Sequence, residues 1–207
     1  MIKKKGLLLV ISGPSGAGKG TVCKELLKRN PDFKLSVSAT TRAPREGEVD
    51  GESYFFLTKE KFSEMIGQGG FLEYAQIYSN FYGTPKGPVM KYLEEGSDVI
   101  LEIEMQGARQ VKEMYPEAVL IFVLPPSLEE LRNRLTTRGT ETEEQVNERL
   151  STSLEEIKQV KDYNYFIFNE NNKTTESAMI IENLIVAEKN KASRYEKAII
   201  KKFEEEL

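Results

Sequence analysis

The sequence has no histidine at all and a single cysteine, Cys23, among its 207 residues. Without histidine, the protein cannot use a histidine general base or a Ser-His-Asp triad, and most kinds of zinc site are excluded. One cysteine excludes an internal disulfide, which is typical of proteins in a reducing compartment. Because small cysteines are common core residues, we expect Cys23 to be a packing residue rather than a reactive thiol.

Long apolar runs and an excess of positive charge are also missing. The first residues, MIKKKGLLLVIS, imitate a signal peptide, but the apolar run is only about seven residues long and no small-residue cleavage site follows it. No stretch approaches the ~20 apolar residues of a membrane span, so we expect a cytoplasmic protein that does not bind membranes. The formal net charge of −4 argues against a broad nucleic-acid surface, but it is compatible with a local basic pocket for a small anionic ligand.

Strand-like apolar runs alternate with helical patterns along the whole chain, and no linker or repeat divides it. This order predicts one α/β domain with a doubly wound parallel sheet. The portion from 54 to 84 is rich in short strands, including a hairpin over 71–85 that turns near Ser79 and Asn80, and it predicts an inserted antiparallel subdomain. The other expected strands lie at 7–12, 34–38, 53–57, 98–105, 118–126 and 165–168.

Several helices have recognisable starts. Thr58 can cap one helix, and the pairs Ser127 with Glu130 and Thr142 with Gln145 have the spacing of a capping box. The C-terminal segment SRYEKAIIKKFEEEL carries an apolar stripe, which predicts a helix that is either docked on the core or faces a second copy. A monomer and a homodimer are therefore both compatible with the sequence.

The segment GPSGAGKGT, residues 13–21, directly follows the first expected strand and opens the first expected helix. A P-loop needs this context, because glycines let backbone N–H groups wrap a phosphate and a helix N-terminus favours negative charge. Lys19 would reach the outer phosphates. The next residue is Gly20, where the strict pattern has Ser or Thr, and the hydroxyl comes one position later at Thr21, which weakens the case for direct Mg²⁺ ligation. The residues assigned to the ATP phosphates are Gly13, Pro14, Ser15, Gly16, Ala17, Gly18, Lys19, Gly20 and Thr21.

The segment SATTRAPREGEVDGESYFF, residues 38–56, holds many hydrogen-bond donors and almost nothing apolar before its end. Arg42 and Arg45 flank Pro44, which stiffens the loop, and two guanidinium groups can bind phosphate oxygens in a bidentate way. Tyr54 adds a neutral hydroxyl donor. Four acidic residues nearby allow another interpretation, a surface loop whose charges cancel, and charge alone does not decide between the two.

In combination, the segments SVSATTRAPREGEVDGESYFF, FLEYAQIYSNFYGTP, ILEIEMQGA and RGTETEEQVNERL, in this order behind SGPSGAGKGT, closely resemble the guanylate kinase family. The resemblance covers essentially the whole chain. It implies a P-loop NTPase fold and transfer of the γ-phosphoryl group of ATP to GMP or dGMP with Mg²⁺, giving ADP and GDP. It also implies three parts: a core at 1–37, 87–135 and 157–207, a GMP-binding subdomain at 38–86, and a helical lid at 136–156.

The resemblance assigns a role to each matching position. The residues that would hold the phosphate of GMP are Arg42, Arg45, Tyr54 and Tyr82, and those that would read guanine are Ser38, Glu73, Thr84 and Glu104. The residues that would act on the ATP phosphates and the transition state are Lys19, Arg134, Arg138 and Arg149, with Arg45 completing the catalytic set. Asn169 would lie near the adenine or its ribose.

The chemistry of guanine agrees with a carboxylate at Glu73. Guanine presents an N1–H and an N2 amine on one edge, which suits an acceptor-only carboxylate, whereas adenine has no such pair of donors. Glu102 and Glu104 lie two apart on the strand expected at 98–105, so they should share one face near its carboxyl end, where open α/β sheets bind ligands. Thr21, Glu102 and Glu104 are candidates for water-mediated contacts with Mg²⁺. The family commonly has Asp where this chain has Glu104, which is one methylene longer.

Two other functions remain open from the sequence. A non-catalytic guanylate-kinase-like interaction module would share the fold, but such modules generally have degraded phosphate loops and extra domains, whereas Lys19 is intact here. A kinase of the same fold that acts on another phosphorylated acceptor, such as UMP, CMP or a ribose bisphosphate, should lack the set Ser38, Glu73 and Thr84.

Overall fold

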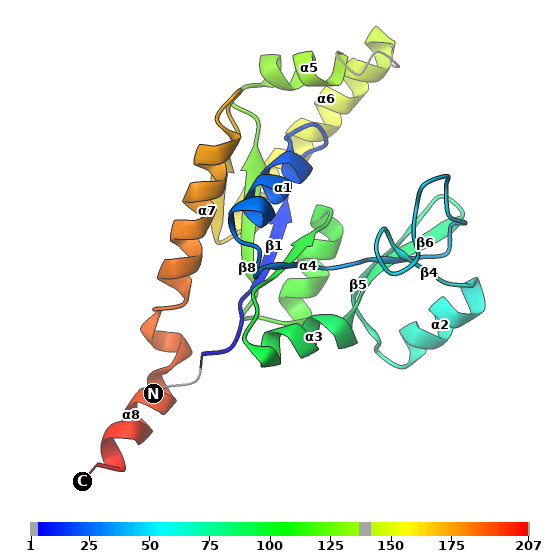
Figure 1. Ribbon diagram of the computed structural model, residues 1–207. Coiled ribbons are helices and arrows are strands. Elements are labelled where there is room, and N and C mark those ends of the chain that lie inside the picture. The colour runs from blue at the N-terminus through cyan, green and yellow to red at the C-terminus, as the bar shows by residue number, and fades with distance from the viewer. Residues whose placement is uncertain (1–3, 137–141, 207) are drawn as a thin grey trace.

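The centre of the protein is a five-stranded sheet with the order β2-β7-β1-β8-β9, seen in a computed structural model that describes residues 4–136 and 142–206 (Figure 1). Every neighbouring pair in this sheet is parallel. The strands are β1 Leu8–Ser12, β2 Lys34–Leu35, β7 Val99–Glu102, β8 Val119–Leu124 and β9 Tyr165–Phe168. The doubly wound parallel sheet expected from the sequence is therefore confirmed.

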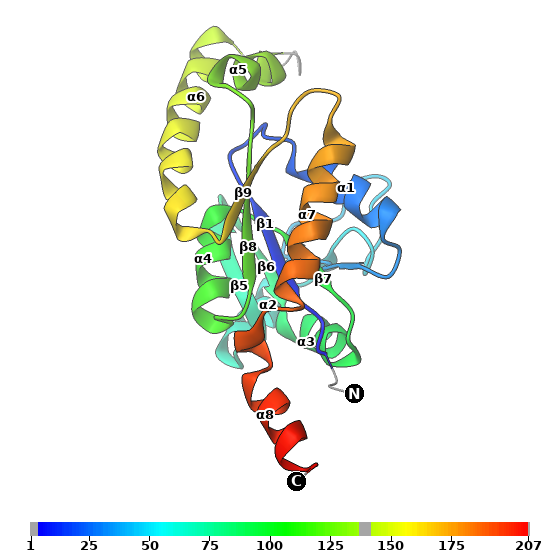
Figure 2. The same cartoon turned by 90° about the vertical axis from the view of Figure 1, so that its left-hand side faces the viewer.

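Helices cover both faces of this sheet, because its strands are apolar on both sides. On β1, Leu9 and Ile11 pack into the cluster formed with α1 and α7, while Leu8 and Val10 pack into the cluster formed with α3 and α4. All four side chains are at most 1% exposed. The four helices are α1 Lys19–Arg29, α3 Lys86–Glu95, α4 Met105–Met114 and α7 Thr174–Glu188. Figure 2 shows α4 and α7 on opposite sides of the strands.

A second, smaller sheet with the order β4-β3-β6-β5 stands beside the first and confirms the expected insertion (Figure 1). It is mixed, since β3 pairs parallel with β4 but antiparallel with β6, and β5 and β6 form the expected hairpin. Phe62 stacks on Phe71 at 4.3 Å and on Phe81 at 5.5 Å between ring centroids, so this part has an apolar core of its own. Its elements are β3 Ala39–Thr40, β4 Phe55–Phe56, α2 Lys59–Gly67, β5 Phe71–Ile77 and β6 Asn80–Pro85.

The helices α5 (Leu128–Thr136) and α6 (Glu143–Ile157) form a third part, at the opposite end of the molecule from the C-terminus (Figure 1). The capping box predicted for Thr142 and Gln145 is confirmed, with both reciprocal hydrogen bonds present. At the start of α5, Ser127 Oγ accepts the N–H of Glu130 at 3.1 Å, as a cap should. After α6, the chain continues as a short 3₁₀ helix, Lys158–Asp162.

Several strand predictions were too long, and two of them bear on the site. The run expected at 34–38 divides, because the chain leaves the first sheet after Leu35 and enters the second sheet at Ala39. The strand expected at 98–105 ends at Glu102, where its partner strand β1 is also ending, with Ile11 paired to Glu102. Glu104 is the N-cap residue of α4 rather than a strand residue, so the predicted shared strand face of Glu102 and Glu104 is wrong.

The C-terminal helix is present but is not docked on the core. Helix α8 (Glu196–Glu204) has no buried residue and extends away from both sheets (Figure 1, Figure 2). Its apolar residues include Ile200 and Phe203, which are 50% and 60% exposed. The docked alternative is therefore wrong, while the dimer-facing alternative stays a prediction. Among the described residues, no helix combines the length and the apolarity that crossing a membrane requires.

Candidate active site

The loop between β1 and α1 has the backbone shape of a phosphate-binding loop. Gly16 and Gly18 have φ angles of 87° and 90°, a left-handed conformation that glycine adopts without strain. At Gly18, an added Cβ would also lie only 2.2 Å from Nδ2 of Asn169. Strand, glycine-rich loop and helix follow one another as predicted, so the N-terminus of α1 faces the loop with Lys19 as its first residue.

Lys19 crosses the loop with its ammonium group. Its Nζ donates to the carbonyl oxygen of Gly13 at 2.6 Å and to that of Pro14 at 3.4 Å. The same atom lies 3.8 Å from Oε1 of Glu104, and the Lys19 side chain is only 11% exposed. A positive charge is thus held at the mouth of the loop, with Glu104 beside it.

Glu102 fills the space next to Gly20, the position at which the strict P-loop pattern has a hydroxyl. An ideal Cβ on Gly20 would lie 3.2 Å from Glu102 Oε1, so glycine leaves room for this carboxylate. The Glu102 side chain is open to solvent, yet partial loss of water around it raises its pKa, and the nearby Lys19 charge opposes that rise. Thr21 instead lines a separate pocket with Gly18, so Thr21 and Glu102, two of the three Mg²⁺ candidates, face different surroundings.

The acidic residues and the cysteine near the loop do not form a metal centre. Cys23 is buried as expected, and its pKa is raised first by that burial and then by the charge of Glu102, so the thiol stays protonated and inert. Within residues 4–136 and 142–206, no three His, Cys, Asp or Glu side chains are grouped so that they could hold a metal ion.

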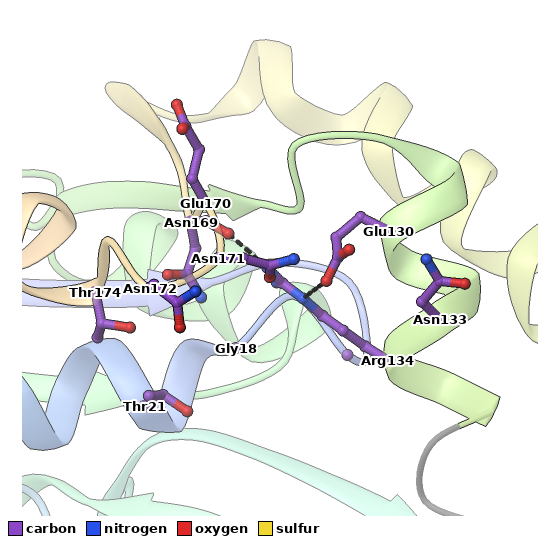
Figure 3. A pocket seen from close by; sticks show the side chains of 11 residues that line it. Gly18, Thr21, Glu130, Asn133, Arg134, Asn169, Glu170, Asn171, Asn172 and Thr174 are labelled. Atoms are coloured by element: carbon purple, nitrogen blue, oxygen red, sulfur yellow. Dashed lines mark hydrogen bonds and ion pairs between the residues drawn. The ribbon is translucent and has the colours of Figure 1, made fainter.

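A pocket of about 600 Å³ lies between α5, the P-loop and the segment after β9 (Figure 3). Arg134 spans it: Nε donates to Glu130 Oε1 at 2.8 Å, and Nη2 donates to the carbonyl oxygen of Asn169 and to Oδ1 of Asn171, both at 2.8 Å. Nη1 donates to the carbonyl oxygen of Ala17 at 3.2 Å. The residues that line the pocket are Gly16, Gly18, Thr21, Glu130, Asn133, Arg134, Asn169, Glu170, Asn171, Asn172 and Thr174.

Asn169 joins this pocket to the P-loop. Its Nδ2 donates to the carbonyl oxygen of Ala17 at 2.9 Å, and the residue is 5% exposed. Its Oδ1 is buried and accepts no hydrogen bond from the described residues. The structure thus brings Asn169 and Arg134 together as expected, and adds Glu130 and Asn171, which the sequence analysis missed although the polar run NENN directly follows the last strand.

Helix α6 approaches the P-loop from the other side. Arg149 Nη2 donates to Oγ of Ser15 at 2.6 Å, so this arginine lies at the loop expected to hold the ATP phosphates. Glu156, a further residue of α6 that the sequence analysis missed, has a buried Oε2 and a pKa that is raised first by burial and then by Glu104. Arg138 lies outside the described residues.

Three of the four residues expected to hold the GMP phosphate lie together: Arg42 and Tyr54 on the segment that leads into the second sheet, and Tyr82 on β6. The guanidinium carbon of Arg42 lies 5.5 Å from the ring centroid of Tyr54, and the ring centroids of Tyr54 and Tyr82 are 6.2 Å apart. Arg42 is also paired with Glu48, through contacts of 2.9 Å and 2.8 Å. The same carboxylate accepts the N–H of Arg45 at 2.7 Å, while the Arg45 residue itself is exposed.

The expected guanine residues Glu73 and Thr84 form a buried pair. Thr84 Oγ1 donates to Glu73 Oε1 at 2.7 Å, and these residues are 0% and 8% exposed, in that order. Burial raises the pKa of Glu73, and the bond from Thr84 opposes the rise. Ser38 is half-buried and accepts the N–H of Phe55 through its carbonyl oxygen at 2.9 Å. Glu104 departs from this group, because its side chain is 65% exposed and its contact is with Lys19 of the P-loop.

Comparison with known proteins gives one family. The family model described as guanylate kinase matches residues 5–188. The chain is 69% identical over 207 residues to the guanylate kinase of Clostridioides difficile strain 630, with all of both chains covered. It is 53% identical over 206 residues to the guanylate kinase of Caldanaerobacter subterraneus subsp. tengcongensis, covering 100% of this chain and 99% of the relative.

A solved structure agrees with these relatives. The crystal structure of guanylate kinase from Anaplasma phagocytophilum superimposes with a TM-score of 0.70 at 35% identity, over 92% of this chain and 90% of that one. The P-loop core and the mixed second sheet are therefore those of a P-loop NTPase α/β fold. On the sequence match and this structural likeness together, the chain belongs to the guanylate kinase family.

Proposed function

We propose that this protein transfers the γ-phosphoryl group of ATP to GMP or dGMP, giving ADP and GDP or dGDP. The observation that carries the proposal is the combination of Lys19 in a P-loop with the buried Glu73–Thr84 pair in a separate sheet. The first group suits a nucleoside triphosphate, and the second suits the donor edge of guanine. Family membership gives ATP and GMP as the substrates.

The donor nucleotide would lie along the P-loop. Backbone N–H groups and Lys19 would hold its outer phosphates, and its base and ribose would occupy the pocket beside Asn169 and Arg134. The Oδ1 of Asn169, which accepts no hydrogen bond from the part of the chain that the structure describes, offers an acceptor at the edge of that pocket. Arg134, Arg138 and Arg149 would surround the transferred phosphoryl group with positive charge.

The acceptor would lie against the second sheet. Arg42, Arg45, Tyr54 and Tyr82 would hold the phosphate of GMP, while Ser38, Glu73, Thr84 and Glu104 would read guanine. An oxygen of the GMP phosphate then attacks the γ-phosphorus, and the bond to the β,γ-bridging oxygen breaks, which leaves ADP. The protein's task is alignment and charge stabilisation, so the absence of histidine does not hinder the reaction.

Mg²⁺ fits the site only together with the nucleotide. The described residues offer no three-ligand cluster, but Glu102 and Glu104 lie near Lys19 and could contact hydrated Mg²⁺ through water. We favour Glu102 over Thr21 for this contact, because Thr21 belongs to the pocket on the Asn169 side. When bound, Mg²⁺ neutralises charge on the phosphates.

The three parts of the fold suggest how the reaction is enclosed. We propose that residues 38–86 bind GMP and that residues 136–156 close as a lid over a core at 1–37, 87–135 and 157–207. The bond from Arg149 to Ser15 supports an α6 that can reach the P-loop. We also propose a cytoplasmic location, since a single cysteine allows no internal disulfide, as is typical of proteins in a reducing compartment. The exposed apolar residues of α8 favour a homodimer over a monomer.

A panel of acceptors tests this function. With ATP and Mg²⁺, GMP and dGMP should give rapid ADP formation, and AMP, CMP and UMP should be far poorer, by ~10⁴ where a hydrogen-bonding site rejects an analogue. Equal rates with GMP and AMP would contradict the guanine assignments. Binding of GMP without turnover would instead favour the interaction module, and turnover of UMP or CMP alone would favour another nucleotide kinase.

A further inference from the structure

Helix α4 carries a glycine, Gly107, where glycine is not favoured. Gly107 is the third residue of the helix and is buried, and a glycine inside a helix is less favourable than alanine. Its backbone is helical, so no unusual φ angle requires glycine here. The reason for glycine must therefore lie in what packs against it.

The carboxylate of Glu73 lies against Gly107. An ideal Cβ on Gly107 would be 2.7 Å from Oε2 of Glu73, 3.1 Å from its Cδ and 3.2 Å from its Cγ. Real Cβ atoms do not approach an oxygen at 2.7 Å, so alanine would force Glu73 to move. The other carboxylate oxygen, Oε1, accepts the hydroxyl of Thr84 at 2.7 Å. The carboxylate is thus held between β6 on one side and the bare backbone of α4 on the other.

One turn further along α4, Gln110 holds the next residue of the strand. Its Oε1 accepts the N–H of Tyr74 at 3.1 Å, and its Nε2 donates to the carbonyl oxygen of Tyr74 at 3.0 Å. Strand β5 is the last strand of its sheet, so within residues 4–136 and 142–206 this edge of Tyr74 has no strand partner. The Gln110 side-chain amide replaces such a partner and fixes β5 to α4, which lie side by side (Figure 1, Figure 2).

We infer that Gly107 and Gln110 are positioning residues for guanine recognition, which place the Glu73 carboxylate without touching the base themselves. The inference rests on the proposed function, in which Glu73 accepts from N1–H and the N2 amine of GMP. Inosine monophosphate lacks that amine but keeps N1–H. The ratio of kcat/KM for GMP to that for inosine monophosphate therefore measures how well Glu73 is placed.

The Gly107→Ala variant should lower kcat/KM for GMP by about tenfold or more, because a hydrogen bond to a charged group is worth at least this much. The loss with inosine monophosphate should be smaller, so the ratio should fall, while the KM for ATP should stay within about twofold because the P-loop is untouched. Gly87→Ala is the matched control. It also places an alanine in a helix, α3. Apart from the chain neighbours of Gly87 and the backbone of its own helix, no atom of the described residues lies within 4 Å of the added Cβ, so the ratio should not change.

Two further variants separate positioning from general damage. Glu73→Asp shortens the side chain by one methylene group and so relieves the crowding against a Cβ at position 107. Gly107→Ala should therefore lower kcat/KM for GMP less in a Glu73→Asp background than in the wild-type protein. Gln110→Glu keeps the side-chain length but replaces the donor to the Tyr74 carbonyl with a charged acceptor, so the ratio should fall in this variant also, even if Gly107→Ala does not fold.

The outcomes separate a failure of the proposed function from a failure of the inference about α4. If the wild-type protein does not prefer GMP to inosine monophosphate and AMP, the proposed function is wrong. If the wild-type protein has this preference, but Gly107→Ala and Gln110→Glu both keep the wild-type ratio, then α4 does not position Glu73 and the inference is wrong.

Discussion

Arg42 and Glu48 are paired side by side, with Nη1 2.9 Å from Oε2 and Nη2 2.8 Å from Oε1. The guanidinium group that we assign to the GMP phosphate is thus already held within its own loop. The pairing lowers the pKa of Glu48 to about 2, first through Arg42 and then through the Arg45 N–H. Glu48 therefore stays ionised at every pH at which the enzyme would work, and it fixes the position of Arg42 rather than switching it.

The Arg42→Ala variant should raise the KM for GMP by about tenfold or more with a smaller change in kcat, since a charge-assisted contact with phosphate is lost already in the ground state. Glu48→Gln keeps Arg42 but loses the charge that orients it, so its KM for GMP should rise less. Steady-state kinetics with GMP varied at saturating ATP measures both. Lys61→Ala, which removes an exposed cation of the same subdomain, is the control. An unchanged KM in Arg42→Ala would show that Arg42 is not a phosphate ligand.

Lys19 should be the residue on which catalysis depends most. Its Nζ donates a hydrogen bond to the Gly13 carbonyl oxygen at 2.6 Å, so the positive charge is in place before the nucleotide binds. Lys19→Ala should lower kcat by about 10²-fold or more, because charge stabilisation of the transferred phosphoryl group is lost. Lys28→Ala, at the exposed far end of α1, should leave kcat unchanged. If Lys19→Ala raised only the KM for ATP, the lysine would serve binding and not the transition state.

The buried carboxylate of Glu73 predicts a particular dependence on pH. Burial raises its pKa above 4.5, and guanine needs the ionised form, so kcat/KM for GMP should rise as the pH increases through that raised value. Stability should respond in the opposite direction. A carboxyl group with a raised pKa contributes most to the free energy of unfolding below pH 4.5, and this contribution is lost as the pH rises through the folded-state value.

The comparison with Glu73→Gln isolates this group. The second ionisation of the GMP phosphate, near pH 6, affects both proteins equally. Profiles of kcat/KM for GMP from pH 4.5 to 8 should therefore differ only in the rise that comes from ionisation of Glu73. The wild-type protein should show this rise, and the Glu73→Gln variant should lack it. Two profiles of the same shape would mean that the protonation of Glu73 does not control GMP capture.

Local patterns predicted the parts of the fold that depend on neighbouring residues in the chain. The P-loop after β1 and the capping box of Thr142 with Gln145 are both fixed within a few residues, and both were predicted correctly. The end of β7 depends on where β1 ends beside it, so Glu104 was placed on a strand although it occupies the N-cap position of α4. Such an end cannot be read from alternation alone.

The partners of charged residues were harder to predict from the sequence than the ends of strands. Four acidic residues lie in the loop after Arg42, and only the folded turn selects Glu48 as its partner. Likewise, Arg134 meets Asn171, 37 residues later in the chain, because α5 and the segment after β9 converge on the P-loop (Figure 3). The resemblance to the family indicated which residues form the site, but these pairings are a consequence of tertiary structure.

Arg149 links the third part of the fold to the P-loop, and it should act on the rate more than on binding. Its Nη2 donates to Ser15 Oγ at 2.6 Å, which places the guanidinium group at the loop that would hold the ATP phosphates. Arg149→Ala should lower kcat by about 10²-fold or more, because an arginine that meets the transition-state charge can contribute 10³ or more. The KM for GMP should stay within about threefold, since Arg149 does not belong to the GMP subdomain.

Two further variants test whether Arg149 acts through its charge and its geometry. Arg149→Lys keeps the charge but loses the planar, bidentate guanidinium, so kcat should lie between those of the wild-type protein and Arg149→Ala. Arg132→Ala, which removes a half-buried arginine of α5 that contacts Asn147, should leave kcat unchanged and serves as the control. If Arg149→Ala and Arg132→Ala had the same kcat as the wild-type protein, α6 would cover the site without taking part in phosphoryl transfer.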